Sequence, residues 1–143
     1  MRFWRHATGG VTVATTALML QACAPQGPQA PAARIFASDM AGAAKACTVP
    51  KVETAAGKQT PVAMKVGNDG GWCAITVSDG GKPFSAGLLT TEPAHGKVLI
   101  HTVGDNTRID YTPDVQYAGA DSFMVRLIPG DATIATTVSV SRP

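Results

Sequence analysis

The sequence predicts a small all-β domain, either a sandwich or a barrel, in the part of the chain that follows Thr48. Short runs of β-branched and aromatic residues follow one another there, and clusters of Gly, Asn, Asp and Pro separate them. The chain has 143 residues, which is the usual size of one domain. We therefore expect a single hydrophobic core.

The segment before Cys23, residues 1–22, is typical of a signal peptide. The part from Met1 to His6 carries Arg2 and Arg5 and no acid, and an uncharged, largely apolar stretch follows from Ala7 to Leu20. As a helix this stretch would be about 21 Å long, whereas the hydrocarbon core of a bilayer is roughly 30 Å thick. As a helix, the stretch is therefore too short to span the hydrocarbon core of a bilayer.

The signal peptide ends in a motif that resembles the lipobox of bacterial lipoproteins. Leu20 stands three residues before Cys23, and the small residue Ala22 directly precedes it. The resemblance implies that the Cys23 thiol receives a diacylglycerol, so that membrane lipid is the first partner and two or three acyl chains anchor the protein. By the family's sorting rule, Ala24 implies the outer membrane, with the module facing the periplasm or the cell surface. The alternative is an ordinary signal peptide in which Cys23 is incidental.

The charge of the processed chain is balanced. Twelve basic residues become ten when Arg2 and Arg5 leave with the signal peptide, and the acidic residues also number ten. A neutral domain without a cluster of Lys and Arg has no electrostatic footprint for nucleic acid. We expect no nucleic-acid partner.

All three cysteines are accounted for if Cys23 carries lipid, because Cys47 and Cys73 then remain as a pair. An oxidising envelope compartment favours a disulfide between them. The alternative is a metal or redox site. There is no C-x-x-C motif, and neither His95 nor His101 lies near a cysteine in the sequence. We therefore expect the disulfide and no metal.

Two segments precede the β-rich part. Residues 23–37 are expected to form the lipidated N-terminus and a flexible tether, because residues 24–33 are rich in Pro, Ala and Gln and carry no charge. Residues 38–48 are expected to form a short helix or an arm. Ser38 could cap an Ala-rich helix from Met40 to Cys47, and the alternative is an irregular arm tied down by Cys47.

The β-rich part, residues 49–143, contains eight short runs, of which about seven are expected to be strands and one early run irregular. Turn residues at 104–106 and 129–131 indicate hairpins between the last two pairs of runs. The runs are Val49 to Thr54, Pro61 to Val66, Trp72 to Ser78, Phe84 to Thr91, Lys97 to Val103, Thr107 to Thr112, Ser122 to Ile128 and Thr133 to Val140.

Alternation assigns side chains to faces, because successive residues of a strand point to opposite sides. Each run then has one face for the core and one for the solvent. In the run from Ser122, one face is expected to carry Phe123, Val125 and Leu127, and the opposite face Ser122, Met124 and Arg126. In the run from Lys97, one face is expected to carry Val98, Ile100 and Thr102, and the opposite face Lys97, Leu99 and His101.

Four motifs follow one another between Thr91 and Val140. Their order and spacing resemble those of the bacterial Ig-like and cadherin-like modules found in envelope and surface proteins. The resemblance implies an Ig-like β-sandwich for residues 49–143. The motifs are Pro93-Ala94-His95-Gly96-Lys97-Val98, Tyr111-Thr112-Pro113, Tyr117-Ala118-Gly119-Ala120-Asp121-Ser122-Phe123 and Thr137-Val138-Ser139-Val140.

The resemblance also implies structural roles for the motif residues. Tyr111 and Phe123 would fill the core between the sheets, and Pro113 and Gly119 would shape the corner that joins them. Asp121 would bond to turn amides. The functional alternative for Asp121 is calcium, but this chain has one module and no D-x-D-x-D loop. We expect no metal ion and no cofactor.

The sequence identifies no catalytic set. It has no G-x-S-x-G elbow, no H-E-x-x-H motif and no Gly-rich phosphate loop, and both His95 and His101 are interpreted as turn or surface residues. The expected function is a non-enzymatic, lipid-anchored cell-envelope module that binds an envelope protein or a polysaccharide. The alternatives are a structural accessory subunit of an envelope assembly and an inhibitor of a periplasmic or host hydrolase.

Overall fold

Eight β-strands and one short 3-10 helix make up residues 36–143, the part of the chain that this computed structural model describes. The signal peptide, Cys23 and the tether to residue 35 lie outside the described residues. No helix in the described part is long and apolar enough to cross a bilayer. The elements are η1 (Ala37–Met40), β1 (Cys47–Thr48), β2 (Gln59–Gly67), β3 (Cys73–Val77), β4 (Ala86–Thr91), β5 (Gly96–Val103), β6 (Asn106–Pro113), β7 (Gly119–Ile128) and β8 (Ala132–Ser141).

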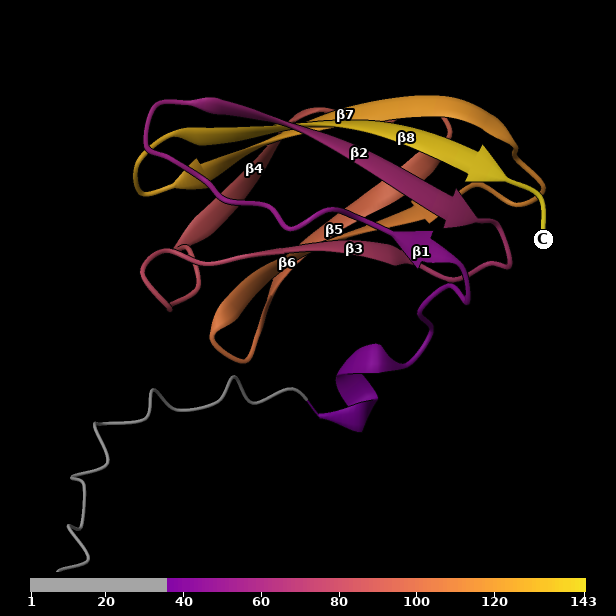
Figure 1. The fold of residues 1–143 in the computed structure, drawn as a ribbon, viewed down its shortest axis with the longest axis horizontal. Helices are drawn as coiled ribbons and strands as arrows, with labels where there is room; N and C mark the ends of the chain where they lie inside the picture. Colours follow the sequence, from indigo (N-terminus) through magenta and orange to yellow (C-terminus); the bar gives the residue numbers. More distant parts are fainter. Residues whose placement is uncertain (1–35) are drawn as a thin grey trace, which may run out of the picture. The chain divides into compact units, whose positions relative to one another are not determined.

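The strands form two sheets that lie on one another as layers (Figure 1). One sheet has five strands in the order β1-β2-β8-β7-β4, and the other has three in the order β3-β6-β5. The pairing of β2 with β8 is parallel, and all other pairings between these strands are antiparallel. The described part is nearly all β and has two sheets, as a β-sandwich does, so the predicted all-β class is confirmed.

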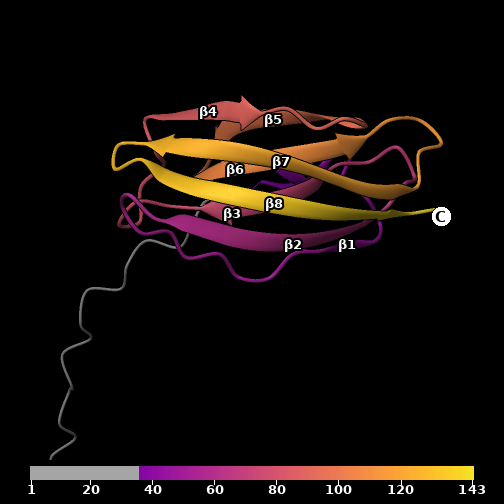
Figure 2. The ribbon, with the colours of Figure 1, turned by 90° about the horizontal axis from the view of Figure 1, so that it is seen from above.

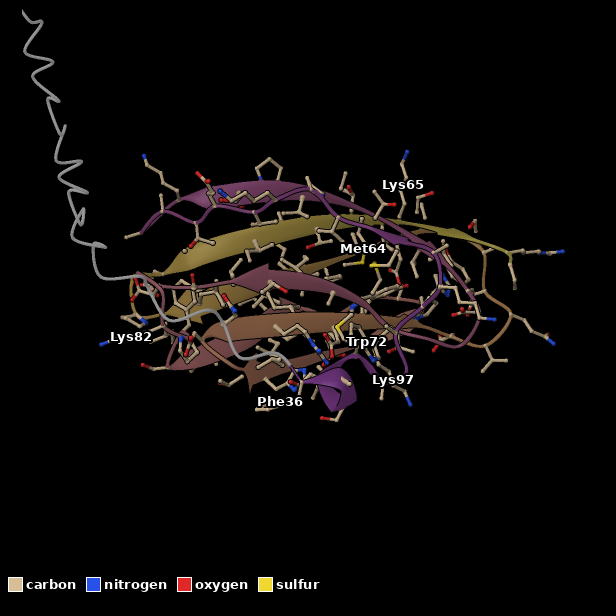
Figure 3. The ribbon with its side chains drawn as sticks, turned by 60° about the horizontal axis from the view of Figure 1, so that its bottom comes forward. Phe36, Met64, Lys65, Trp72, Lys82 and Lys97 are labelled. Carbon is tan, nitrogen blue, oxygen red and sulfur yellow. A yellow bond between two sulfur atoms is a disulfide. The ribbon has the colours of Figure 1, made fainter. Side chains whose placement is uncertain are left out.

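The core lies between the two sheets and follows the alternation of the strands. On β7, Phe123 is buried and Ser122 and Arg126 are exposed, as the alternation predicts. On β2, Met64 lies between the layers, and Lys65 points away from them (Figure 3). The alternation of side chains along the strands therefore places one set in the apolar core between the sheets and the other set on the two outer faces.

The predicted strands and hairpins are found within a few residues of their expected ends, with one exception. Residues 49–54 form no strand, although Val49 and Val52 pack against the core. One early run of the eight was expected to be irregular, and residues 49–54 are that run. On β5, Thr102 is exposed although it lies on the row that points inward, and His101 is half-buried although it lies on the outward row.

The Ala-rich stretch forms an arm and not the helix from Met40 to Cys47. Only Ala37–Met40 makes a helical turn, and the chain then runs beside Trp72. The Ala44 amide donates to the Trp72 carbonyl at 2.8 Å, and the Trp72 amide donates to the Gly42 carbonyl at 3.0 Å. These bonds to another segment replace the bonds that a helix would make within itself.

The arm passes so close to the chain before β3 that Gly71 is required there. A Cβ atom at Gly71 would lie 2.4 Å from the Ala44 nitrogen, which is far inside van der Waals contact. We define the arm as residues 36–46. It is fixed to the three-stranded sheet, and it ends at a covalent link.

That link is the predicted disulfide between Cys47 and Cys73, whose Cα atoms are 5.3 Å apart. Cys73 is fully buried at the start of β3, and Cys47 is exposed in β1. The bond joins the end of the arm in one sheet to a core strand of the other.

We expect replacement of both Cys47 and Cys73 by Ser to lower the free energy of unfolding by roughly 2 to 5 kcal/mol, because the unfolded chain gains the freedom of a loop of 26 residues. Urea denaturation of the wild type with and without reductant checks the value. A double variant that unfolds at the wild-type urea concentration would contradict it.

Candidate interaction surfaces

An ionic cluster lies on the outer face of the three-stranded sheet. Arg108 Nε and Nη2 donate to the two carboxylate oxygens of Asp110 at 2.8 and 2.9 Å, and both residues belong to β6. On the neighbouring strand β5, His101 Nε2 lies 3.0 Å from Asp110 Oδ2. The side chains of Arg108 and Asp110 are only 9% and 5% exposed. The pair is bidentate and largely removed from water.

The arm covers this cluster. The Arg108 guanidinium lies 4.0 Å from the centre of the Trp72 ring, in a cation–π contact. Trp72 Nε1 donates to the Ala41 carbonyl at 3.0 Å, and Arg108 Nη1 donates to the Asp39 carbonyl. The hydrogen bonds of Arg108 therefore go to Asp110 and to the arm, which holds the arm against the sheet.

A cavity of about 310 Å³ remains between the arm and the sheet. Both parts contribute to its lining, which is mostly apolar. Its walls include Met40, Ala43, Trp72, Thr76, Asn106 and Arg108.

Three large apolar side chains are exposed around the arm. Phe36 is 65% exposed, Met40 is 55% exposed, and Leu99 on β5, which pairs with Asp110, is 58% exposed. We call this surface the arm face: it consists of the arm and the outward side chains of β3, β6 and β5. Phe36, Trp72 and Lys97 all lie on this side of the molecule (Figure 3).

The five-stranded sheet presents a different outer surface, which we call the open face. It consists of the outward side chains of β2, β8, β7 and β4, and no described segment crosses β8 or β7 on this side (Figure 2). Its central side chains are small, and a hollow of about 220 Å³ lies among them beside Met124. Leu88 is exposed on β4. The small residues are Ala63, Ala120, Ser122, Ala135, Thr137 and Ser139.

Asp121 is the centre of a hydrogen-bonded corner near the start of β7. Its carboxylate accepts from the amides of Ala94, His95 and Ser122 at 2.9, 3.0 and 2.8 Å. It also accepts from the Tyr111 hydroxyl at 2.8 Å. The predicted bonding of Asp121 to turn amides is therefore confirmed.

These contacts shift the acidity of both side chains. Burial raises the pKa of Asp121, but the hydrogen bonds from the Tyr111 hydroxyl and from three backbone amides outweigh it and hold that pKa below its ordinary value. Burial, followed by the bond to Asp121, raises the pKa of Tyr111 far above its ordinary range. The corner is built around an ionised carboxylate and a neutral phenol.

The remaining motif residues pack around this corner. A Cβ at Gly96 would lie 2.6 Å from the Tyr111 ring, and one at Gly119, whose φ is 148°, would lie 2.8 Å from the Tyr117 hydroxyl. Pro113 is buried and pairs with Gly96, and Pro93 is half-buried before β5.

The two aromatic residues assigned to the core both reach it. Tyr111 is 0% exposed and Phe123 is 1% exposed, and their rings stack with centroids 5.7 Å apart. The prediction that they share one core is confirmed.

We expect Asp121→Asn to lower the free energy of unfolding at neutral pH by about 1 to 3 kcal/mol, since charged hydrogen bonds are lost. The folded-state pKa of Asp121 is depressed, so its stabilisation is present above the unfolded pKa of about 3.9 and is lost as the pH falls through the folded pKa. The difference between wild type and variant should therefore shrink below about pH 4. Urea denaturation across that range measures it, and a constant difference would contradict it. Asp105→Asn in an exposed turn is the control.

Sequence reasoning missed the cluster of Arg108, Asp110 and Trp72. Arg108 and Asp110 alternate with apolar residues and so have the pattern of exposed outward side chains. His101, interpreted as a turn or surface residue, has a side chain only 35% exposed against Asp110. The spacing of two that places Arg108 and Asp110 on one face of a strand was the available signal. Contacts with Trp72, His101 and the arm, all remote from the pair in the sequence or on another strand, cover it.

The described residues hold no group of three or more His, Cys, Asp or Glu side chains that could bind a metal ion. Comparisons of the chain with protein families, with characterised proteins and with solved structures found no match.

Proposed function

We propose that the protein is a lipid-anchored binding module of the outer membrane, with an Ig-like fold and no enzymatic activity. The strand order supports the fold. Counted from β2 as the first strand, β3-β6-β5 has the order B-E-D of an Ig sandwich, and β4-β7-β8 has the order C-F-G. The departures are β2, which lies beside the last strand, and the disulfide, which joins β1 to β3.

Acylation of Cys23 is the anchoring step of the proposal. It rests on the sequence from Leu20 to Cys23 and on the pairing of Cys47 with Cys73, which leaves Cys23 without a partner among the three cysteines. Intact mass spectrometry of protein extracted from the envelope tests it. We expect the mass of residues 23–143 plus a diacyl or triacyl group. An unmodified Cys23, or cleavage beyond it, would overturn the anchor.

The open face carries the proposal of binding. It extends over four strands, has small side chains at its centre, and carries the cations Lys65 and Arg126. Small side chains allow a partner to approach the sheet closely, and Met124 and Leu88 provide apolar contact of the kind that protein interfaces bury. The partner we propose is an envelope protein, and a polysaccharide is the other outcome of the test.

A matched pair of variants tests the open face. Ala63→Arg places a long cation on the open face, on β2 beside Thr137 of β8, and Ala55→Arg places the same side chain in an exposed loop away from that face. After crosslinking in intact cells, we expect wild type and Ala55→Arg to retain the same protein and Ala63→Arg to lose it. Recovery of a glycan in place of a protein would change the partner class. Equal recovery by all three proteins would exclude the open face.

A further inference from the structure

We propose that the arm face lies on the bilayer surface, so that the module rests on its membrane with the open face turned away from it. This inference rests on the proposed lipid anchor at Cys23. The lipid surface is the partner, and Phe36, Met40 and Leu99 are the side chains that enter it.

Phe36, the first described residue, belongs to the arm face. Only the short segment 24–35 separates Phe36 from Cys23. A chain of that length spans at most about 45 Å when fully extended, and a flexible coil of that length has a root-mean-square span of about 20 Å. A lipid on Cys23 therefore keeps the arm face closer to the membrane than a random orientation would.

Most of the exposed large apolar side chains gather on the arm face. Of the five large apolar side chains that are exposed in the described residues, Phe36, Met40 and Leu99 belong to this face. Exposed apolar groups beside a lipid surface leave water for the interfacial region, where aromatic rings are favoured. Lys97, two residues from Leu99 on the same outward row of β5, supplies an ammonium group for lipid phosphate.

The exposed apolar side chains of the arm face are held in place. Arg108 and Trp72 fix the arm through the Asp39 and Ala41 carbonyls, and the Phe36 amide donates to Asp39 Oδ2 at 2.7 Å. The apolar groups therefore stand on a rigid platform, and little ordering entropy opposes their insertion.

Charge decides which lipid is needed. The arm face carries the positive charges of Arg108, Lys97 and Lys45 against the carboxylates of Asp110 and Asp39, a formal excess of one positive charge. A single excess charge gains little from anionic lipid. Three side chains alone bind a bilayer weakly, and the high local concentration that the anchor provides makes the contact persistent. We therefore expect docking on zwitterionic membranes and only when the chain is anchored.

Paramagnetic broadening of amide signals tests the orientation. Residues 23–143, with Cys47 and Cys73 kept oxidised, are coupled through the Cys23 thiol to a maleimide lipid in phosphatidylcholine nanodiscs that contain a gadolinium-chelating lipid. In the wild type we expect strong broadening of η1 and β5 and little in the centre of β8. In Phe36→Ser/Met40→Ser/Leu99→Ser we expect this difference between faces to fall to the weak bias that the tether alone imposes.

The matched control is Leu88→Ser/Val115→Ser, which removes the other two exposed apolar side chains, 41% and 89% exposed, and should broaden like the wild type. Uniform broadening of the wild type, strongest broadening on the open face, or an unchanged pattern in the triple variant would each overturn the proposal. In the first two cases, the apolar side chains would be assigned to a protein interface instead. Chemical coupling makes this result independent of acylation in cells, which the intact mass decides.

Discussion

Replacement of Phe123 by Ala is expected to lower the free energy of unfolding by about 3 to 5 kcal/mol. The ring is 1% exposed, stacks on Tyr111 at 5.7 Å between centroids, and would leave a cavity between two sheets that are held apart by their other side chains. A domain of this size has a total stability of about 5 to 15 kcal/mol. The variant is therefore expected to be close to unfolding at physiological temperature.

Thermal and urea denaturation of residues 23–143 measure this loss. Arg126→Ala, three residues along the same strand with a side chain 48% exposed, is the control and should change stability by less than about 0.5 kcal/mol. If Phe123→Ala melted like the wild type while Arg126→Ala unfolded, the register of β7 would be wrong.

Replacement of Arg108 by Met is expected to cost a similar amount, about 3 to 5 kcal/mol, for an electrostatic reason. The variant leaves the Asp110 carboxylate 5% exposed and without its bidentate partner. It also removes the bond to the Asp39 carbonyl and the contact with Trp72, so the start of the arm loses a link to the sheet, while the bonds between the arm and Trp72 remain. Urea denaturation measures the stability, and amide exchange of residues 36–46 measures the release of the arm.

A second substitution separates the charge from the packing. In Arg108→Met/Asp110→Leu no charge is left unpaired, and well-packed apolar pairs often equal buried ion pairs in stability. We expect the double variant to be more stable than Arg108→Met by at least about 1 kcal/mol. A double variant that is less stable than Arg108→Met would show that loss of packing, and not the orphaned carboxylate, destabilises the single variant.

The strands were predictable because each carries its own local signal. Residues 97–103 and 107–112 were expected as strands, and the structure has Gly96–Val103 and Asn106–Pro113. Alternating apolar residues and the turn at 104–106 are enough to define this hairpin, since both depend on neighbouring residues. The corner around Asp121 was predictable for a different reason, namely the resemblance of its motif.

The arm and the ionic cluster were not predictable in this way. The Ala-rich residues after Met40 have helical propensity, but Trp72 and Cys73 offer bonds that a propensity scale does not include. Arg108 has the sequence context of a solvent-exposed residue, and its burial depends on an arm that contacts it from 69 positions away. Contacts of this range follow from tertiary packing, which no local pattern encodes.

The disulfide also determines how mechanical tension would travel through the module. A pull on the lipid proposed for Cys23 would reach Cys47 and pass through the covalent bond directly to Cys73 at the start of β3. Residues 48–72 lie inside the closed loop, so this covalent route bypasses the chain segment that contains β2. A proposed partner that pulled on the open face would therefore load the pairing of β3 with β6 and the packing between the two sheets.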